Sequence, residues 1–249
     1  MLILTLNEEH NIGACIETVR AADEIIVLDS GSTDRTAEVA IAHGAKVATR
    51  GMSDFAEQRN YAASLAKSDW VLHLDADERV TPELWNEIQA ATTADHANGF
   101  LVPCLNMVFG APLRHGGWYP QYHLRLQRRG KATWTGNVHE AASVGGVVQP
   151  LRAPIVHFGH PDVRTFVRKL DRYTDFEAEA LRGSVFRLGV LAVVTPAPYF
   201  IYKYVIQGGF MDGWRGLAAA LLLSFYRCVT HLKAMERLAT HEASTGASR

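Results

Sequence analysis

The chain has 249 residues, of which 48% are hydrophobic and 20% are charged. This is the composition of a folded globular protein, and it excludes a disordered chain or a repetitive fibre. The formal net charge of −1 argues against a nucleic-acid binder that acts through bulk positive charge. The three cysteines are scattered and form no C-x-x-C pair, which predicts reduced thiols in a cytoplasmic compartment.

The first hundred residues alternate between short apolar runs and helical patterns. The apolar runs fit strands of a parallel sheet that is covered on both faces, and the helical patterns fit its crossover connections. The predicted strands are 2–6, 24–28, 45–49 and 70–74, and the predicted helices are 11–21, 33–43, 55–67 and 81–92. This order predicts an α/β fold, in which ligands bind beyond the carboxyl ends of the parallel strands.

After residue 98 the pattern changes to strands separated by loops rich in Gly, Trp and His, followed by helices. The strands are predicted at 99–108, 122–127 and 147–158, an amphipathic helix at 164–181, an apolar arm at 185–207 and a last helix from 214 to about 238. We therefore expect a main domain over 1–181 with halves 1–97 and 98–181, a helical arm over 182–238, and a flexible tail over 239–249.

The charge is distributed unevenly along the chain. Residues 1–181 hold 17 Lys+Arg and 23 Asp+Glu, a net charge of −6, whereas residues 182–237 hold 7 and 2, a net charge of +5. The basic part is also the most apolar, which is typical of a segment on an anionic membrane surface. Its longest uncharged run, 188–202, contains two prolines and is shorter than the roughly 20 apolar residues that span a bilayer. The amino-terminal residues show no signal-peptide pattern.

Asp75 and Asp77 form a D-x-D pair directly after the apolar run 70–74. One carboxylate can accept hydrogen bonds from ribose hydroxyls, while the other binds a divalent cation that takes its remaining ligands from substrate phosphates and water. The alternative is a solvated loop whose acids cap the next helix. The position of the pair, in line with Asp29 at the end of the run 24–28, favours a ligand site.

Asp29 opens a second polar segment, 29–34. Its carboxylate can accept from a base N–H or a ribose hydroxyl, whereas helix capping is enough to explain Ser32 to Asp34. The chain has no G-x-G-x-x-G or P-loop motif, so phosphate would be held by a metal ion or by basic side chains such as Arg59.

Three further groups have both a structural and a functional interpretation. His139 and Glu140 do not form an H-E-x-x-H zinc motif, but Glu140 can act as a general base, or the two can pair at a strand end. Trp118 can stack on a sugar or fill a core. His157 and His160 could form a metal pair, but core or turn positions fit them better. A solvated basic edge is the default for four further residues, which could otherwise bind phosphate: Arg125, Arg128, Arg129 and Lys131.

Four motifs of the first half resemble the nucleotide-binding half of inverting glycosyltransferases of family 2, which have the GT-A fold: LILTLNEEHNI, EIIVLDSGSTDRT, FAEQRNYA and WVLHLDADERV. Four motifs of the second half are similar to bacterial lipopolysaccharide or lipooligosaccharide core β-1,4-glucosyltransferases: HGGWYP, RLQRRG, WTGNVHE and YVIQGGFMDGWRGLAAALLLSFYR. The likeness covers roughly residues 2–237. It implies a mostly parallel GT-A sheet with helices on both faces, in which 1–97 binds nucleotide and 98–181 binds acceptor.

The resemblance also implies roles for single residues. Thr5, Asn7, Glu9 and Asp29 match positions that line the nucleoside. Asp77 matches the ligand of a divalent metal, Mg or Mn, and a catalytic position, whereas Asp75 matches the ribose contact. Glu140 stands where the base that activates the acceptor is expected, next to His139 and near Trp118 on the acceptor side.

The implied reaction is direct displacement with inversion, which moves a sugar, glucose above all, from a nucleotide-sugar such as a UDP-sugar to an envelope glycan. The expected partners are this donor, a glycan or lipid-linked acceptor, and the inner face of the cytoplasmic membrane, with no nucleic acid.

Three alternatives remain open from the sequence. A polyprenyl phosphate in place of a core sugar would need no strong base. A D-x-D phosphatase or phosphotransferase would use Asp75 as its nucleophile, although Arg79 stands where that class has Thr or Val. A membrane-surface scaffold without catalysis would use only the basic arm.

Overall fold

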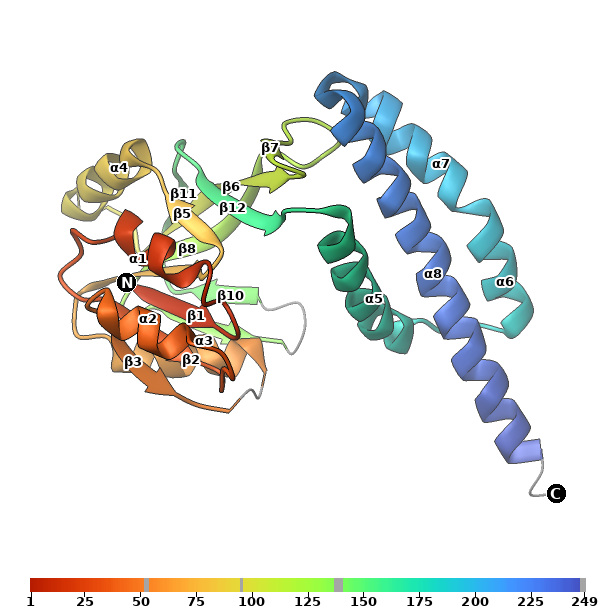
Figure 1. Cartoon of the computed structure of the whole chain (residues 1–249), viewed down its shortest axis with the longest axis horizontal. Helices are drawn as coiled ribbons and strands as arrows, with labels where there is room; N and C mark the ends of the chain where they lie inside the picture. Colours follow the sequence, from red (N-terminus) through yellow and green to blue (C-terminus); the bar gives the residue numbers. More distant parts are fainter. Residues whose placement is uncertain (52–53, 95, 137–140, 247–249) are drawn as a thin grey trace. The chain divides into compact units, whose positions relative to one another are not determined.

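The computed structural model describes residues 1–51, 54–94, 96–136 and 141–246, which form two compact units. The first unit comprises Met1–Leu105 and Pro120–Gly159, and the second comprises Asn106–Tyr119 and His160–Arg249. Figure 1 labels most of the helices and strands of both units.

The first unit begins with four parallel strands joined by helices. These elements are β1 (Leu2–Thr5), α1 (Ile12–Thr18), β2 (Ile26–Asp29), α2 (Thr36–Ala42), β3 (Lys46–Thr49), α3 (Phe55–Leu65) and β4 (Trp70–Asp75). The strands lie in the order β3-β2-β1-β4, and each predicted strand and helix is found within a few residues of its expected bounds.

Helices cover both faces of these parallel strands, because successive side chains of a strand point to opposite sides. Ile3 belongs to a core with Ile12 and Ile16 of α1, whereas its neighbour Leu2 belongs to a core with Ala62 of α3. Burying apolar side chains on both faces explains why each strand is a continuous apolar run.

The rest of the first unit extends the sheet beyond β4 with mainly antiparallel strands. They are β5 (Glu78–Val80), β6 (Gly99–Val108), β8 (Gln121–Arg128), β11 (Val148–Pro150) and β12 (Ile155–His160), with helix α4 (Pro82–Thr93) between β5 and β6. Beyond β4 the neighbouring strands of the sheet follow in the order β8-β6-β12-β5, and the short strand β7 (Ala111–Pro112) pairs with β6. A separate hairpin joins β9 (Ala132–Thr135) to β10 (Ala141–Val144). The sheet is therefore fully parallel in its amino-terminal part, and beyond β4 the pair of β11 with β6 is also parallel.

Capping side chains set the start of two helices in this unit. Asp54 accepts a hydrogen bond from the backbone N–H of Glu57 at 2.6 Å at the start of α3, and Thr81 accepts one from Leu84 at 3.1 Å at the start of α4. Pro82 occupies the first turn of α4, where it has no N–H to leave unpaired.

The second unit is mainly helical, and it also contains β7 and the end of β6. Its helices are α5 (Val163–Ala180), α6 (Val185–Val194), α7 (Pro196–Ile201), the π-helical turn η1 (Tyr202–Ile206), the 3-10 turn η2 (Gly209–Asp212) and α8 (Gly213–Gly246). The long helix α8 runs beside α6 and α7 on one side and α5 on the other (Figure 1). The core of the second unit contains Phe109, Leu113, Phe166, Leu170 and Ala219.

The boundaries of the second unit differ from those expected from the sequence. Helix α5 joins the helical unit, although 164–181 was expected in the main domain. Helix α8 extends to Gly246, beyond residue 238 where the sequence pattern placed its end, and the flexibility of the tail stays a prediction. The sequence there contains no proline and no glycine before Gly246, so nothing interrupts the helix.

Candidate active site

The carboxyl ends of β1 and β4 lie next to each other, with Leu4 paired with Asp75. The chain runs outward from β1 through β2 to β3 and then places β4 on the other side of β1, so the strand order reverses between β1 and β4. Open α/β sheets bind ligands at such a reversal, beyond the carboxyl ends of the strands. The polar side chains that end β1, β2 and β4 therefore share one edge.

Two buried arginines hold the Asp75 carboxylate. Nη2 of Arg59, from α3, lies 3.2 Å from Oδ1, and Nη2 of Arg125, from β8, lies 3.2 Å from Oδ2. The Asp75 side chain nevertheless stays 36% exposed. Although desolvation opposes ionisation, the charges of Arg125 and Arg59 hold the pKa of Asp75 well below its usual range. Asp75 is therefore an ionised acceptor with fixed orientation and an open edge.

Glu78 contacts both Arg125 and the backbone of Asp75. Its side chain is buried, its carboxylate pairs with Arg125, and it accepts a hydrogen bond from the backbone N–H of Asp75 at 2.9 Å. Burial raises the pKa of Glu78 to about 7, with the neighbouring Asp75 charge acting in the same direction and Arg125 opposing it. Glu78 thus fixes both the guanidinium of Arg125 and the turn that carries the D-x-D pair.

Asp77 faces an imidazole from a distant strand. Nε2 of His157, in β12, lies 3.3 Å from Oδ2 of Asp77, and the register places His157 opposite Glu78. Although burial opposes protonation, hydrogen bonds with Asp77 and Cys104 raise the pKa of His157 to about 10. The Asp77 carboxylate and the His157 imidazole therefore form a pair two residues along the chain from Asp75.

Asn7 and Glu9 join the loop after β1 to the turn before α2. Oδ1 of Asn7 accepts from the N–H of Thr33 at 2.8 Å, and Oε2 of Glu9 accepts from the N–H of Arg35 at 3.1 Å. The N–H of Asn7 donates in turn to Oγ of Ser32 at 2.9 Å. Asn7 has a φ of +55°, in the left-handed region that Asn tolerates better than most residues. These two side chains thus fix the shape of the loops around the edge.

Asp29 and Thr5 end neighbouring strands and are paired in register. Asp29 is buried and accepts hydrogen bonds from both the N–H and the hydroxyl of Ser32. Oγ1 of Thr5 is also buried, but it makes no hydrogen bond with any residue that the structure describes. Such a group is uncommon, because buried hydroxyls normally have partners, and the role of Thr5 in binding the nucleoside stays a prediction.

The sequence profile of Glycosyl transferase family 2 matches residues 1–144, more than half of the chain. The chain belongs to glycosyltransferase family 2. The GT-A fold class expected from the sequence, an α/β domain with a carboxyl-terminal helical arm, is confirmed.

Curated relatives match this glycosyltransferase over nearly its whole length. A lipopolysaccharide core biosynthesis glycosyltransferase, LpsC of Rhizobium meliloti, is 30% identical over 94% of this chain and 91% of its own. An uncharacterized glycosyltransferase of Rickettsia typhi is 27% identical over 94% and 85%.

Two solved structures are similar with low superposition scores. Glucosyl-3-phosphoglycerate synthase of Mycobacterium tuberculosis, solved with Mn²⁺, UDP and its product, is 27% identical over 43% of each chain, with a TM-score of 0.36. TarS 1–349 of S. aureus is 13% identical over 100% of this chain and 91% of its own, with a TM-score of 0.48.

The predicted base and acceptor-binding residues are His139, Glu140 and Trp118. His139 and Glu140 lie outside the described residues. Trp118 belongs to the second unit, where its ring contacts those of His160 at 5.8 Å and Phe166 at 6.3 Å, as a core residue does. Its role in binding acceptor stays a prediction.

Sequence reasoning missed three residues of the site. Arg125 was expected on a solvated edge, but it is buried because Asp75 and Glu78 neutralise its charge. His157 was expected to be a core or turn residue together with His160, yet it pairs with Asp77, while His160 packs on aromatic rings. Glu78 received no role at all. The excess of acids over bases at 75–79 was the signal that a distant cation had to lie here.

Within the described part of the chain, no group of three or more His, Cys, Asp or Glu side chains could hold a metal ion by itself. Asp77 and His157 nevertheless place one carboxylate oxygen and one imidazole nitrogen 3.3 Å apart. The carboxylate fits Mg²⁺ or Mn²⁺ when substrate phosphates and water complete the coordination, and the imidazole could join it only after the metal displaces its proton.

Proposed function

We propose that this glycosyltransferase moves glucose, with inversion, from UDP-glucose to a hydroxyl of a lipopolysaccharide core at the inner face of the cytoplasmic membrane. The observation that carries the proposal is the pair Asp77 and His157 beside the arginine-held Asp75 at the strand reversal. The relationship to LpsC over nearly the whole chain supports the acceptor class.

In this proposal the edge residues bind the nucleoside. Asp75 accepts from the ribose hydroxyls through its exposed edge, and the buried hydroxyl of Thr5 and the carboxylate of Asp29 lie on the neighbouring strands. Asn7 and Glu9 keep the loops in place. Arg59, which the sequence suggested as a phosphate ligand, acts by orienting Asp75, since its guanidinium lies 3.2 Å from that carboxylate and over the Trp134 ring at 4.9 Å.

Asp77 and His157 would hold a divalent metal, Mg or Mn, together with the donor diphosphate. When bound, such an ion stabilises the negative charge that develops on the leaving diphosphate. The protein orients the ligand pair through the backbone, because the N–H of Phe158 donates to the carbonyl of Asp77 at 2.9 Å.

Glu140 is proposed as the base that takes the proton of the acceptor hydroxyl, with His139 beside it and Trp118 on the acceptor side. Glu140→Gln tests this role, because general base catalysis contributes about 10²- to 10⁴-fold. A loss of this size in the transfer rate, with unchanged binding of UDP, supports a hydroxyl acceptor. Little loss favours a phosphate acceptor, such as a polyprenyl phosphate, which needs no strong base.

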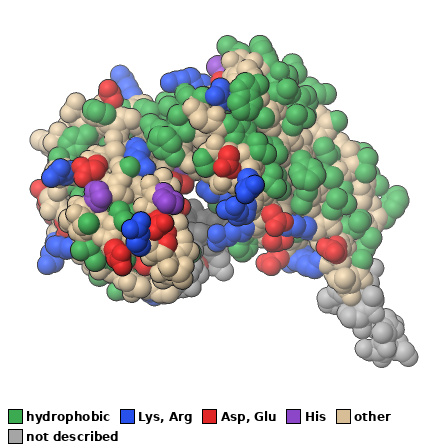
Figure 2. Space-filling model, in the orientation of Figure 1, with side chains coloured by type: hydrophobic (Ala, Val, Ile, Leu, Met, Phe, Trp, Pro, Cys, Tyr) green, Lys and Arg blue, Asp and Glu red, His purple; other side chains and the backbone are tan. Residues whose placement is uncertain are grey.

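The second unit is proposed to dock on the membrane through an apolar face formed by α6, η1, η2 and the start of α8. Figure 2 shows hydrophobic side chains gathered over these helices, and Phe186 and Val193 are 81% and 79% exposed. In the described part of the chain, one helical segment, Val185–Ile206, is long and apolar enough to cross a bilayer. Only 11% of its most apolar stretch of 18 residues is buried. Because this face carries basic residues, we propose that it lies on an anionic surface.

Nucleotide binding is the first test of the donor. Thermal unfolding is compared for UDP, GDP, CMP and ADP, each with Mg²⁺, with Mn²⁺ and with a chelator. A ligand at a hundredfold excess over its dissociation constant stabilises the fold by about 2.7 kcal/mol. Stabilisation by UDP that requires the metal supports the proposal, and the absence of any stabilisation contradicts it. Transfer from UDP-glucose to isolated core oligosaccharide then tests the acceptor.

A further inference from the structure

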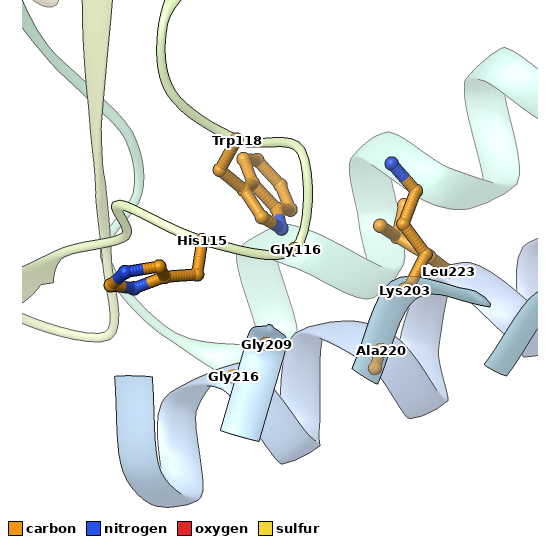
Figure 3. A pocket seen from close by; sticks show the side chains of 8 residues that line it. All are labelled: His115, Gly116, Trp118, Lys203, Gly209, Gly216, Ala220 and Leu223. Atoms are coloured by element: carbon orange, nitrogen blue, oxygen red, sulfur yellow. The ribbon is translucent and has the colours of Figure 1, made fainter. Parts of the chain in front are cut away.

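Two loops of the second unit are locked together by backbone contacts. The N–H of Gly116 donates to the carbonyl of Gln207 at 2.8 Å, and Asp212 accepts from the N–H of His115 at 2.8 Å and from its ring nitrogen at 2.9 Å. Figure 3 shows His115, Gly116 and Trp118 on one loop, facing Gly209. The space between the loops has no room for a water molecule. The elements that flank this junction are therefore held in fixed positions.

Lys203 lies at the rim of this junction and lacks an acidic partner. It is half-buried, and among the described residues no carboxylate lies within ion-pair distance of its amino group. Two acids of the same unit have other partners, since Asp212 binds the His115 loop and Glu177 hydrogen-bonds to Tyr226. Burial and the charge of Arg227 lower the pKa of Lys203. A cation that is half-buried without a counter-ion is costly for the folded protein.

Arg227 brings a second positive charge to the same place. Its guanidinium lies 4.8 Å from the centroid of the Tyr199 ring, and the amino group of Lys203 lies 5.8 Å from that same centroid and 6.0 Å from the Tyr202 ring. Arg227 also has no carboxylate within ion-pair distance in the part of the chain that the structure describes. The positive charge of Arg227 disfavours the protonated form of Lys203, and an anion bound near both groups would offset this effect.

The surroundings of the two cations indicate where this anion comes from. Val205, Ile206 and Met211, within a few residues of Lys203, are 52%, 71% and 62% exposed and belong to the apolar face. A guanidinium and an ammonium group together match the oxygens of a phosphate. Cations bordering exposed apolar side chains are suited to the boundary between lipid headgroups and acyl chains.

We propose that Lys203 and Arg227, which both lie against the Tyr199 ring, bind the phosphate of an anionic phospholipid headgroup. This site rests on the membrane docking proposed above, and it adds to that docking a preference for lipids with a phosphate group. It gives the half-buried ammonium its missing counter-ion, and it fixes the orientation of the second unit on the bilayer.

The first test measures flotation with vesicles of phosphatidylcholine and with vesicles that also contain phosphatidylglycerol. We expect Lys203→Met and Arg227→Gln each to weaken binding to the phosphatidylglycerol vesicles about tenfold or more. The matched control is Arg187→Gln, an exposed arginine of α6 outside the cluster. It should lose about fivefold or less, the value for one basic residue near an anionic surface. Equal losses in all three variants mean attraction by bulk charge alone and overturn the site.

A second test separates phosphate from negative charge. Vesicles with the same surface charge are made from phosphatidylcholine and a fatty acid, which carries a carboxylate instead of a phosphate. We expect the parent protein to bind these vesicles more weakly, and Lys203→Met to match Arg187→Gln on them. Equal binding to both kinds of vesicle contradicts a phosphate site. Inorganic phosphate is added in a third arm, and if it displaces the protein completely at millimolar concentration, a free phosphate is the ligand and the assignment to lipid is wrong.

These outcomes are distinct from failure of the docking proposal. If the parent protein floats with neither phosphatidylcholine nor phosphatidylglycerol vesicles, membrane docking itself is wrong, and the lipid site with it. If the parent protein floats and only the variant pattern fails, docking stands without the site. Lys203→Met keeps the apolar stem and removes an unpaired charge, so its thermal unfolding should match or exceed that of the parent, which verifies that the variant is folded.

Discussion

The two units hold their cationic side chains in opposite ways. In the first unit, Arg59 and Arg125 are paired with Asp75 and Glu78, and the ion pairs orient one exposed carboxylate edge. In the second unit, Lys203 and Arg227 lie beside exposed apolar side chains with no carboxylate at ion-pair distance within the described residues. The first arrangement holds its geometry without help and suits a small polar ligand. The second is completed only by a partner, and it suits a surface that supplies both anions and apolar chains.

The largest expected effect separates catalysis from docking. Asp77→Asn removes the charge that pairs with His157 and would hold the metal, so the transfer rate should fall about 10²- to 10³-fold. Vesicle flotation should stay the same, because it depends on other residues. Thermal unfolding without ligand should shift down modestly, because the largely buried imidazole of His157 loses its charged partner. The control is Asp69→Asn, an exposed aspartate just before β4, which should leave the rate unchanged. Normal transfer by Asp77→Asn contradicts the assignment of this site.

The ion pairs of the first unit should also carry a large part of its stability. Arg125→Met leaves the buried Glu78 carboxylate without its cation, and breaking a buried pair in this way costs about 3–5 kcal/mol. Urea denaturation measures the change in the free energy of unfolding. Arg20→Met, which removes a 79% exposed arginine paired with Glu17, should change it by less than about 0.5 kcal/mol. A similar, small effect for both variants would show that the pair with Glu78 is not needed for folding.

The loop junction of the second unit should be sensitive to a single methyl group. A Cβ at Gly216 would lie 1.8 Å from the carbonyl oxygen of Gly209, so Gly216→Ala should destabilise the protein by about 1–3 kcal/mol. Gly189→Ala, in α6, would place its Cβ only against the flexible Met235 side chain at 3.4 Å. It should stabilise the protein by about 0.5–1 kcal/mol through its higher helix propensity. Thermal unfolding of both variants tests the contrast, and equal effects would refute it.

The smallest effect concerns two cysteines, one in each unit. Burial raises the pKa of the Cys15 thiol to about 12, so its thiolate is scarce at pH 8 and iodoacetamide should label it slowly. The half-buried Cys228 of α8 should react faster. Mass spectrometry of timed samples measures both rates, with the urea-unfolded protein as the control in which both thiols react alike. Faster labelling of Cys15 than of Cys228 in the folded protein would mean that the core beneath Asp75 opens readily.

The elements and the polar strand ends could be predicted from the sequence, because both depend on local patterns. Strands β1 to β4 and helices α1 to α4 follow from apolar runs, helical periodicity and caps such as Thr81 and Pro82. The same patterns place Asp29 and Asp75 at one edge, since parallel strands share their carboxyl ends. The end of α8 was set too early because a polar helical stretch has no apolar periodicity to reveal it.

The partners of the D-x-D pair were decided by the tertiary structure alone. Arg125 is 50 residues away from Asp75, and His157 is 80 residues away from Asp77. What brings them together is the register of β8 against β4, with Leu126 opposite Leu72, and of β12 against β5, with His157 opposite Glu78. A shift of one residue would turn each side chain to the other face of the sheet, and no local pattern encodes that choice. The sequence therefore determined which carboxylates form the site, and the pairing of distant strands determined which cation and which imidazole complete it.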